Sequence, residues 1–368
     1  MVSRPALVTL TGICLAFLLA IASRIPAARS LPAHSQTGEP ASASSLQTTP
    51  VPEAADVKQR GVALGLFAED VSFSYAPLLQ EIVALGATHV SLVVPFYQRH
   101  AASTALRLHT RLSPTLEAIA DAIRLSRRAG LEVTLFPIVR LSEPRSPKEW
   151  RGTLAPADRD AWFASYGSLL ADLASLGALT GVSRLVVGSE LSSLDGDLAH
   201  WRPLVGRIRA LFTGTLIYSA NWDHYQDARL YELMDEIGVV AYFNLRAKDG
   251  PSDVAALTER WRSLRREIEF NLAAYAKPLV LTELGYRSRA GATAAPWDEV
   301  PGGVPDVDEQ TRAFQAFRQA WTAGGLPSSH LAGLYLWNWY GYGGPETTSY
   351  TPRGKPAVDV VRQILGEM

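Results

Sequence analysis

The amino-acid sequence predicts an α/β fold, a single (β/α)8 TIM barrel over residues 58–368. Eight short β-branched stretches recur after Arg60, and most are apolar at nearly every position, as expected for strands covered on both faces. Amphipathic stretches of helical period separate them, and this repeated alternation is typical of a parallel barrel. About 310 residues are available for the domain, and such a barrel takes about 250 residues or more.

We expect the strands at residues 62–67, 89–95, 132–139, 183–189, 216–221, 238–243, 279–282 and 333–337. We expect the helices at residues 77–85, 113–128, 158–176, 201–212, 228–236, 253–275, 308–323 and 355–365. Gly130 and Gly177 follow two of these helices, where a glycine often ends a helix. A doubly wound open sheet is the alternative, but it usually has fewer strands, and no glycine-rich dinucleotide turn follows the first strand.

The N-terminal residues read as a targeting segment rather than as part of the barrel. An apolar run over residues 6–22 lies between Arg4 and Arg24, and its length falls between that of a signal-peptide core and that of a spanning helix. We therefore expect residues 1–29 to be a signal peptide or an N-terminal membrane anchor. Residues 30–57 are rich in Ser, Thr, Ala and Pro, which predicts a disordered linker. The expected location is secreted, periplasmic or tethered to the outer face of a membrane.

The composition excludes several classes of function. The formal net charge is -1, with 35 basic and 36 acidic residues, which argues against a nucleic-acid partner. The one cysteine, Cys14, lies in the N-terminal apolar run, so the expected domain has no disulfide and no cysteine-based site. The seven histidines are scattered, and no His-x-His pair follows the first strand. We expect no metal, no cofactor and a monomer.

Two glutamates stand where predicted strands end. Glu190 follows the fourth strand and Glu283 follows the seventh, and the carboxyl ends of barrel strands meet at the face where chemistry occurs. Hydrolysis of a glycosidic bond needs such a pair: one carboxyl protonates the leaving oxygen, and the other attacks the anomeric carbon or activates water. The alternative is that each glutamate is a solvated loop residue or pairs with an arginine.

Aromatic and amide side chains follow the same strand ends. Sugar rings present apolar C–H faces that match flat aromatic rings, while their hydroxyls seek amides and charged groups. The candidate sugar contacts are Tyr242, Trp337, Asn221, Trp222, Gln98, Arg140 and Trp339. Core packing is the alternative for each aromatic ring taken alone. A phosphate site on the glycines after the eighth strand, at residues 341–344, fits the neighbouring aromatic rings less well.

These motifs resemble the clan of retaining (β/α)8 glycosidases and, within it, glycoside hydrolase family 113, the β-mannanase family. The resemblance rests on the Gly-Ser-Glu turn at Glu190 and on the stretches at residues 95–98, 220–222, 282–286 and 337–339, and it covers roughly residues 60–366. Ser189 stands where the clan usually has asparagine. The resemblance implies that Glu190 is the acid/base and Glu283 the nucleophile, and that Tyr242 binds Glu283.

The resemblance further implies cleavage of a β-linked polysaccharide or oligosaccharide by double displacement, in the manner of an endo-β-1,4-mannanase. The alternative is a catalytically inactive carbohydrate-binding barrel in a cell-surface polysaccharide system. Such a protein would keep the aromatic cleft but would not need both carboxylates.

Overall fold

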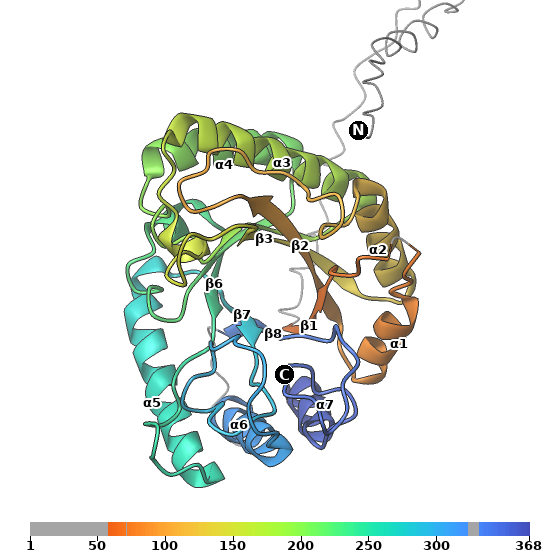
Figure 1. The fold of residues 1–368 in the computed structure, drawn as a ribbon, viewed down its shortest axis with the longest axis vertical. Helices are drawn as coiled ribbons and strands as arrows, with labels where there is room; N and C mark the ends of the chain where they lie inside the picture. The colour runs from red at the N-terminus through yellow and green to blue at the C-terminus, as the bar shows by residue number, and fades with distance from the viewer. Residues whose placement is uncertain (1–57, 71, 323–330) are drawn as a thin grey trace, which may run out of the picture. The chain divides into compact units, whose positions relative to one another are not determined.

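The computed structural model describes residues 58–70, 72–322 and 331–368, and these form a closed barrel of eight parallel strands in the order β1 to β8 (Figure 1). Strand β1 pairs with both β2 and β8, which closes the ring. The strands are β1 (Gln59–Gly65), β2 (His89–Gln98), β3 (Glu132–Leu141), β4 (Arg184–Ser189), β5 (Thr215–Ala220), β6 (Glu236–Val240), β7 (Leu279–Leu284) and β8 (Leu331–Leu336). The predicted (β/α)8 barrel is confirmed.

Helices cover the outside of the barrel, as Figure 1 shows. They are α1 (Ala76–Ala84), α2 (Leu116–Arg128), α3 (Arg159–Thr180), α4 (Leu198–Leu211), α5 (Val254–Leu272), α6 (Val307–Trp321) and α7 (Ala357–Glu367). Side-chain caps begin several of them: the Asp158 carboxylate accepts a hydrogen bond from the Ala161 N–H at the start of α3, and Asp253 does the same for Ala256 at the start of α5.

Two predicted helices differ from the structure. Helix α3 does not stop before Gly177 but continues to Thr180, where Gly181 ends it in the left-handed conformation at φ 71°. Gly177 is instead a packing position, because a Cβ there would lie 3.3 Å from the ring of Phe212. The helix predicted at residues 228–236 is only a short 3-10 helix, η2 (Arg229–Leu233), because the turns after β5 use much of this connection and β6 begins at Glu236.

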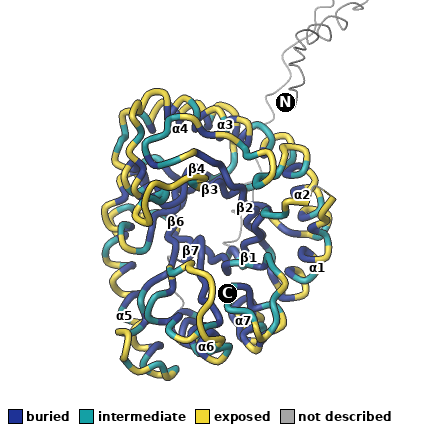
Figure 2. Tube along the Cα trace, in the orientation of Figure 1, coloured by how far each residue is buried: buried dark blue, intermediate teal, exposed yellow. Residues whose placement is uncertain are grey.

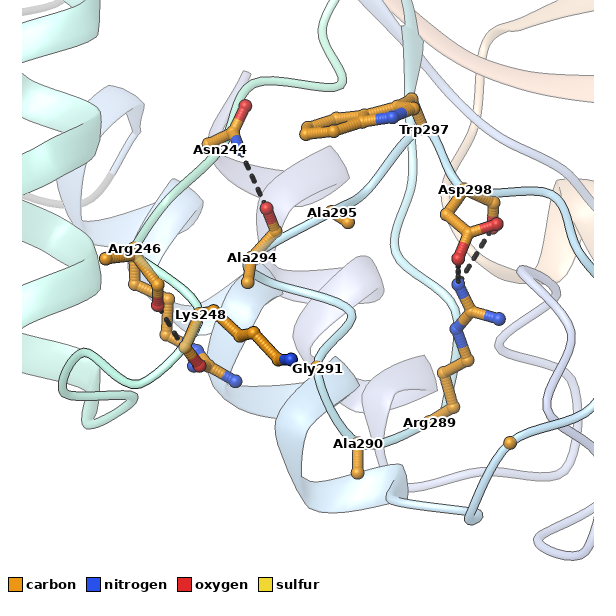
Figure 3. A pocket seen from close by; sticks show the side chains of 12 residues that line it. Asn244, Arg246, Lys248, Arg289, Ala290, Gly291, Ala294, Ala295, Trp297 and Asp298 are labelled. Atoms are coloured by element: carbon orange, nitrogen blue, oxygen red, sulfur yellow. Dashed lines mark hydrogen bonds and ion pairs between the residues drawn. The ribbon is translucent and has the colours of Figure 1, made fainter.

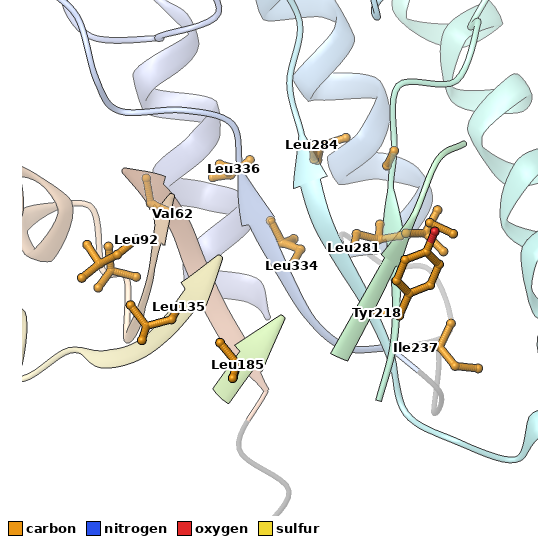
Figure 4. Close-up of a cluster of buried hydrophobic side chains, with 14 of the residues drawn as sticks. Val62, Leu92, Leu135, Leu185, Tyr218, Ile237, Leu281, Leu284, Leu334 and Leu336 are labelled. Carbon is orange, nitrogen blue, oxygen red and sulfur yellow. The ribbon is translucent and has the colours of Figure 1, made fainter. Parts of the chain in front are cut away.

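The hydrophobic core has two layers. The larger layer lies between the strands and the helices, and Figure 4 shows part of it, including Leu135, Leu281 and Leu334. The smaller layer fills the barrel and ends at Tyr242 and Trp337, beneath the mouth. Figure 2 shows the strands buried and the outer sides of the helices exposed. The side chains at the mouth of the barrel are therefore supported from below by a closely packed core.

Polar groups close the opposite end of the barrel. The Gln59 amide donates to the Glu236 carboxylate at 3.1 Å, and Arg184 lies 3.5 Å from the same carboxylate. The Tyr335 hydroxyl donates to the side-chain amide oxygen Oε1 of Gln59 at 3.0 Å and also contacts the Thr134 hydroxyl at 2.7 Å. These buried groups satisfy one another, as buried polar groups must.

The predicted targeting segment and linker lie outside the described residues. No helix within the described ranges is both long and apolar enough to span a membrane.

Candidate active site

Glu190 and Glu283 both lie at the carboxyl ends of their strands and are almost fully buried, with 7% and 3% of their surface exposed. Glu190 directly follows β4 and adopts φ 53°, an uncommon conformation for a residue other than glycine. Its N–H donates to the Ser219 carbonyl on β5 at 2.7 Å, which holds this turn in place. Positive φ in a non-glycine residue often marks a functional position.

Tyr242 orients Glu283. Its hydroxyl donates to Oε2 of Glu283 at 2.7 Å, whereas Oε1 of the same carboxylate is buried and has no hydrogen-bond partner among the described residues. Tyr242 comes two residues after the end of β6, and the Ala241 N–H donates to the backbone carbonyl of Glu283 at 2.7 Å. One carboxylate oxygen is therefore held and the other is free to act on a bound molecule.

Arg151 is paired with Glu190. It begins the short 3-10 helix η1 (Arg151–Thr153) in the connection between β3 and α3, and its Nε lies 3.2 Å from Oε2 of Glu190. The two side chains are only 17% and 9% exposed, so solvent screens this ion pair weakly. The sequence offered an arginine partner only as a general alternative, and nothing in the loop sequence pointed to this residue.

The two carboxyls change each other's ionisation. Burial and the nearby charge of Glu190 raise the pKa of Glu283 to about 8, although the Tyr242 hydroxyl and Arg151 act in the opposite direction. Burial also raises the pKa of Glu190, and the Arg151 guanidinium opposes this rise. The pair therefore keeps a proton to a higher pH than an ordinary carboxyl does. One protonated and one ionised carboxyl is the state that glycosidic chemistry requires.

A cleft of about 280 Å³ opens at the mouth of the barrel, and its lining includes Arg151, the ion-pair partner of Glu190, but neither glutamate itself. Its walls combine aromatic rings with charged and amide groups: Phe67, Ile138, Arg140, Arg151, Arg287, Glu299, Trp337, Asn338, Tyr340, Ser349, Tyr350 and Thr351. Trp337 and Arg140 are therefore at the mouth, where the sequence placed them. The exposed Arg140 guanidinium lies 5.9 Å from the centre of the Phe67 ring. This mixture of flat rings and hydrogen-bonding groups suits a sugar.

Asn221 and Trp222 follow β5, next to the same face. The Asn221 amide donates to the Asp223 carboxylate at 2.7 Å, and the charge of Asp223 contributes to the raised pKa of Glu190. The Trp222 indole stacks on Trp297 with ring centroids 4.8 Å apart. Beyond Trp297 lies a second pocket, of about 530 Å³ (Figure 3).

Gln98 and Trp339 are not among the residues that line the cleft, and their side chains make other contacts within the described structure, which does not support their predicted role as sugar contacts. The buried Gln98 amide accepts from the Trp162 indole N–H at 2.8 Å and donates to the His100 carbonyl at 2.9 Å, so both of its ends are occupied. Trp339 is buried in the layer under the helices and donates to the Glu81 carboxylate at 2.8 Å. Both residues stabilise the barrel wall.

Loop residues supply several groups that the sequence did not single out as site residues. Glu299 lies on the loop between β7 and α6 and lines the cleft, and its charge raises the pKa of both glutamates. Arg287 fastens this loop through hydrogen bonds to the Thr348 carbonyl at 2.7 Å and the Val300 carbonyl at 2.5 Å. Strand periodicity ends before these positions, so no sequence pattern marks them.

Comparison with known proteins agrees with this geometry. The family model for Glycoside Hydrolase Family 113 matches residues 68–350. A search of curated proteins found no match. The structure is similar to the GH113 β-mannanase AaManA from Alicyclobacillus acidocaldarius in complex with ManMIm, with 26% identity, a TM-score of 0.74, and coverage of 84% of this chain and 97% of that one.

Two further solved structures share the fold. One is a GH113 β-1,4-mannanase complex with 20% identity, a TM-score of 0.74, and coverage of 84% of this chain and 99% of that one. The other is a Faecalibacterium prausnitzii β-glucuronidase with 14% identity, a TM-score of 0.57, and coverage of 85% of this chain and 49% of that one. With the family model matching most of its length, the chain belongs to glycoside hydrolase family 113 and is a glycoside hydrolase.

Proposed function

We propose that the protein cleaves β-linked mannan-type polysaccharides or oligosaccharides with retention of anomeric configuration, using Glu283 as nucleophile and Glu190 as acid/base. The observation that supports this most directly is the Tyr242–Glu283 hydrogen bond, which holds Oε2 at 2.7 Å, while Oε1 has no partner in the part of the chain that the structure describes. A nucleophilic carboxylate needs one oriented oxygen and one free oxygen.

The reaction proceeds by double displacement. Oε1 of Glu283 attacks the anomeric carbon, the glycosidic C–O bond breaks, and the leaving oxygen takes the proton of Glu190. Glu190, now a carboxylate, accepts a proton from water as that water attacks the same carbon and releases Glu283. Arg151 stabilises the carboxylate form of Glu190 between the two steps, and Trp337 supports the sugar ring.

The choice of mannan rests on the similarity to AaManA, which is named as a β-mannanase, over 84% of this chain. Internal cleavage of a β-1,4-linked chain is the mode we propose. Digestion of β-linked mannans, glucans, xylans and galactans, with the products separated by length, tests substrate and mode together. We expect release of short oligosaccharides from mannan and little from the other polymers. Release from another polymer alone would reject the mannan assignment.

Substitution of the two glutamates tests their roles. Glu283→Gln should lower turnover by roughly 10³- to 10⁵-fold on every substrate, because no glycosyl-enzyme can form. Glu190→Gln should be far less harmful with an aryl glycoside whose leaving group needs no proton than with an oligosaccharide. Proton NMR of the first product should show the β-anomer. Near-normal turnover of both variants would instead favour a binding barrel whose chemistry lies elsewhere.

For the cell, we propose that residues 1–29 export the protein and either are removed or anchor it, so that residues 58–368 work as a monomer outside the cytoplasm. The apolar run at residues 6–22 supports this. Fractionation of the producing cell, with the N-terminus of the recovered protein sequenced, distinguishes a cleaved from a retained segment.

A further inference from the structure

The second pocket, beyond Trp297, is larger than the catalytic cleft and plays no part in the mechanism above. Two loops form it: the loop between β6 and α5 and the loop between β7 and α6 (Figure 3). It has a volume of about 530 Å³, and its walls are Asn244, Arg246, Ala247, Lys248, Arg289, Ala290, Gly291, Ala294, Ala295, Trp297, Asp298 and Gly303. This volume is in the range of small-molecule sites.

Trp297 forms an apolar platform at the edge of this pocket. Its indole is 40% exposed, and one face stacks on Trp222 at 4.8 Å with an angle of 24° between the rings. The stacking fixes the orientation of the ring and leaves its other face available. The electron-rich face of an indole attracts the C–H groups of a sugar ring.

The polar groups left free in the pocket match a neutral sugar. Arg246 is paired with Glu309 on α6 at 3.2 Å, and Arg289 is paired with Asp298 of its own loop at 2.5 Å, so both arginines are neutralised. The Asn244 amide nitrogen donates to the Ala294 carbonyl at 2.8 Å, which leaves its carbonyl oxygen as an acceptor.

Lys248 supplies the donor. Among the described residues its ammonium group has no hydrogen bond or ion pair, and in Figure 3 its side chain extends toward Gly291 across the pocket. An apolar platform with one acceptor and one donor group is the combination by which proteins bind hexoses, whose ring faces are apolar and whose edges are hydroxyls.

Trp222 connects this pocket to the catalytic centre. It packs against the hydrophobic cluster inside the barrel that contains Tyr242 and Trp337, and its ring stacks on Trp297. A sugar chain bound over Trp337 can therefore continue along Trp222 toward Trp297. From this continuity we infer that the second pocket is a distal subsite, which binds a hexose unit of the chain several units from the scissile bond. The inference rests on the proposed function.

The test measures how catalytic efficiency depends on substrate length. Wild-type protein and Trp297→Ala are compared on β-1,4-linked manno-oligosaccharides of three to six units. We expect the ratio of kcat/KM on the hexasaccharide to kcat/KM on the trisaccharide to fall by about tenfold in Trp297→Ala, as for removal of an aromatic anchor. Trp297→Phe, which keeps a flat ring, should recover part of the ratio. Lys248→Met should lower it by a few-fold.

Phe270→Ala is the matched control, since Phe270 is an exposed aromatic residue on α5 that lines neither pocket. It should leave the ratio unchanged. An unchanged ratio in Trp297→Ala, or an equal loss on both lengths, overturns the subsite.

If the proposed function is wrong, the wild-type protein will cleave none of the oligosaccharides, and this outcome differs from failure of the subsite alone. In that case calorimetric titration of Glu283→Gln with mannohexaose, with and without Trp297→Ala, still decides the subsite. Weaker binding in the double variant supports it, and equal or absent binding rejects it.

Discussion

Arg151 forms an ion pair with Glu190 in which Nε lies 3.2 Å from Oε2, and the two partners come from different connections of the barrel. The arginine thus opposes the burial that would otherwise keep Glu190 protonated, and it also lowers the pKa of Glu283. In an acid/base cycle this charge matters twice, because Glu190 must both give up a proton and take one back.

Replacement of Arg151 by methionine should move the whole pH profile upward. The rate falls in acid as Glu283 becomes protonated and falls in alkali as Glu190 loses its proton, and Arg151 lowers the pKa of both. Both limbs of kcat/KM against pH should therefore rise by about one unit in Arg151→Met. Arg140→Met is the control, because Arg140 lines the same cleft without pairing with either glutamate. Superimposable profiles for wild type and Arg151→Met would show that the ion pair does not tune the reaction.

Removal of the Tyr242 hydroxyl should slow the chemical step more than it weakens binding. The hydrogen bond to Glu283 favours the ionised form and fixes its orientation. In Tyr242→Phe we expect kcat to fall by roughly 10- to 100-fold with KM nearly unchanged, and the acid limb to move to higher pH. Tyr350→Phe removes a hydroxyl from the neighbouring ring, whose hydrogen bond goes to the Pro296 carbonyl, and serves as control. A rise in KM alone would assign Tyr242 to substrate binding.

Glu283 should destabilise the folded protein at alkaline pH. Its folded pKa of about 8 lies above its ordinary value of 4.5, so the folded state binds the proton more tightly. This contribution favours folding below the unfolded pKa and is lost as the pH rises through the folded pKa. Glutamine cannot ionise, so Glu283→Gln should melt about 2–5 °C above wild type at pH 9, and the difference should shrink as the pH falls and vanish below about pH 4, where the unfolded carboxyl is protonated as well.

Thermal melts of wild type, Glu283→Gln and Glu346→Gln across this range provide the measurement. Glu346 is an exposed carboxyl in the connection after β8, and its substitution serves as the matched control. A constant difference between Glu283→Gln and wild type at all pH values would contradict the raised pKa.

Gln98 should prove to be a structural residue. Gln98→Ala leaves the buried Trp162 indole N–H without its acceptor, which costs about 1–3 kcal/mol of unfolding free energy. Chemical denaturation should detect this loss, while KM on a mannan oligosaccharide stays within about twofold of wild type. A large rise in KM with unchanged stability would restore Gln98 to the list of sugar contacts.

The eight strands and the positions of the two glutamates could be predicted because they follow from periodicity. Each strand is a run of buried apolar residues, and a charged residue directly after such a run has to stand at an end of the barrel. Glu190 and Glu283 met this condition. The ends of helices were harder to predict. Gly177 looked like the end of a helix, yet a glycine stands there because a Cβ would lie too close to the Phe212 ring.

Side-chain direction beyond the last paired residue could not be read from the sequence. Trp337 lines the cleft, whereas Trp339 points into the helix layer toward Glu81, because regular alternation ends at Leu336. Arg151 and Trp297 lie in loops whose path depends on contacts with distant segments, such as the pairing of Arg151 with Glu190. Such contacts have no local signature.

Trp297 and Glu299 stand two residues apart on one loop, and they reach different compartments: the first lines the second pocket, and the second lines the catalytic cleft. The Arg289–Asp298 ion pair fixes the residue between them. An insertion, a deletion or an exchange of this loop between relatives would thus alter the optimal acidity of the reaction and the preferred length of the glycan at the same time. We therefore expect the pH optimum and the preferred glycan length to change together among relatives and engineered variants that differ in this loop.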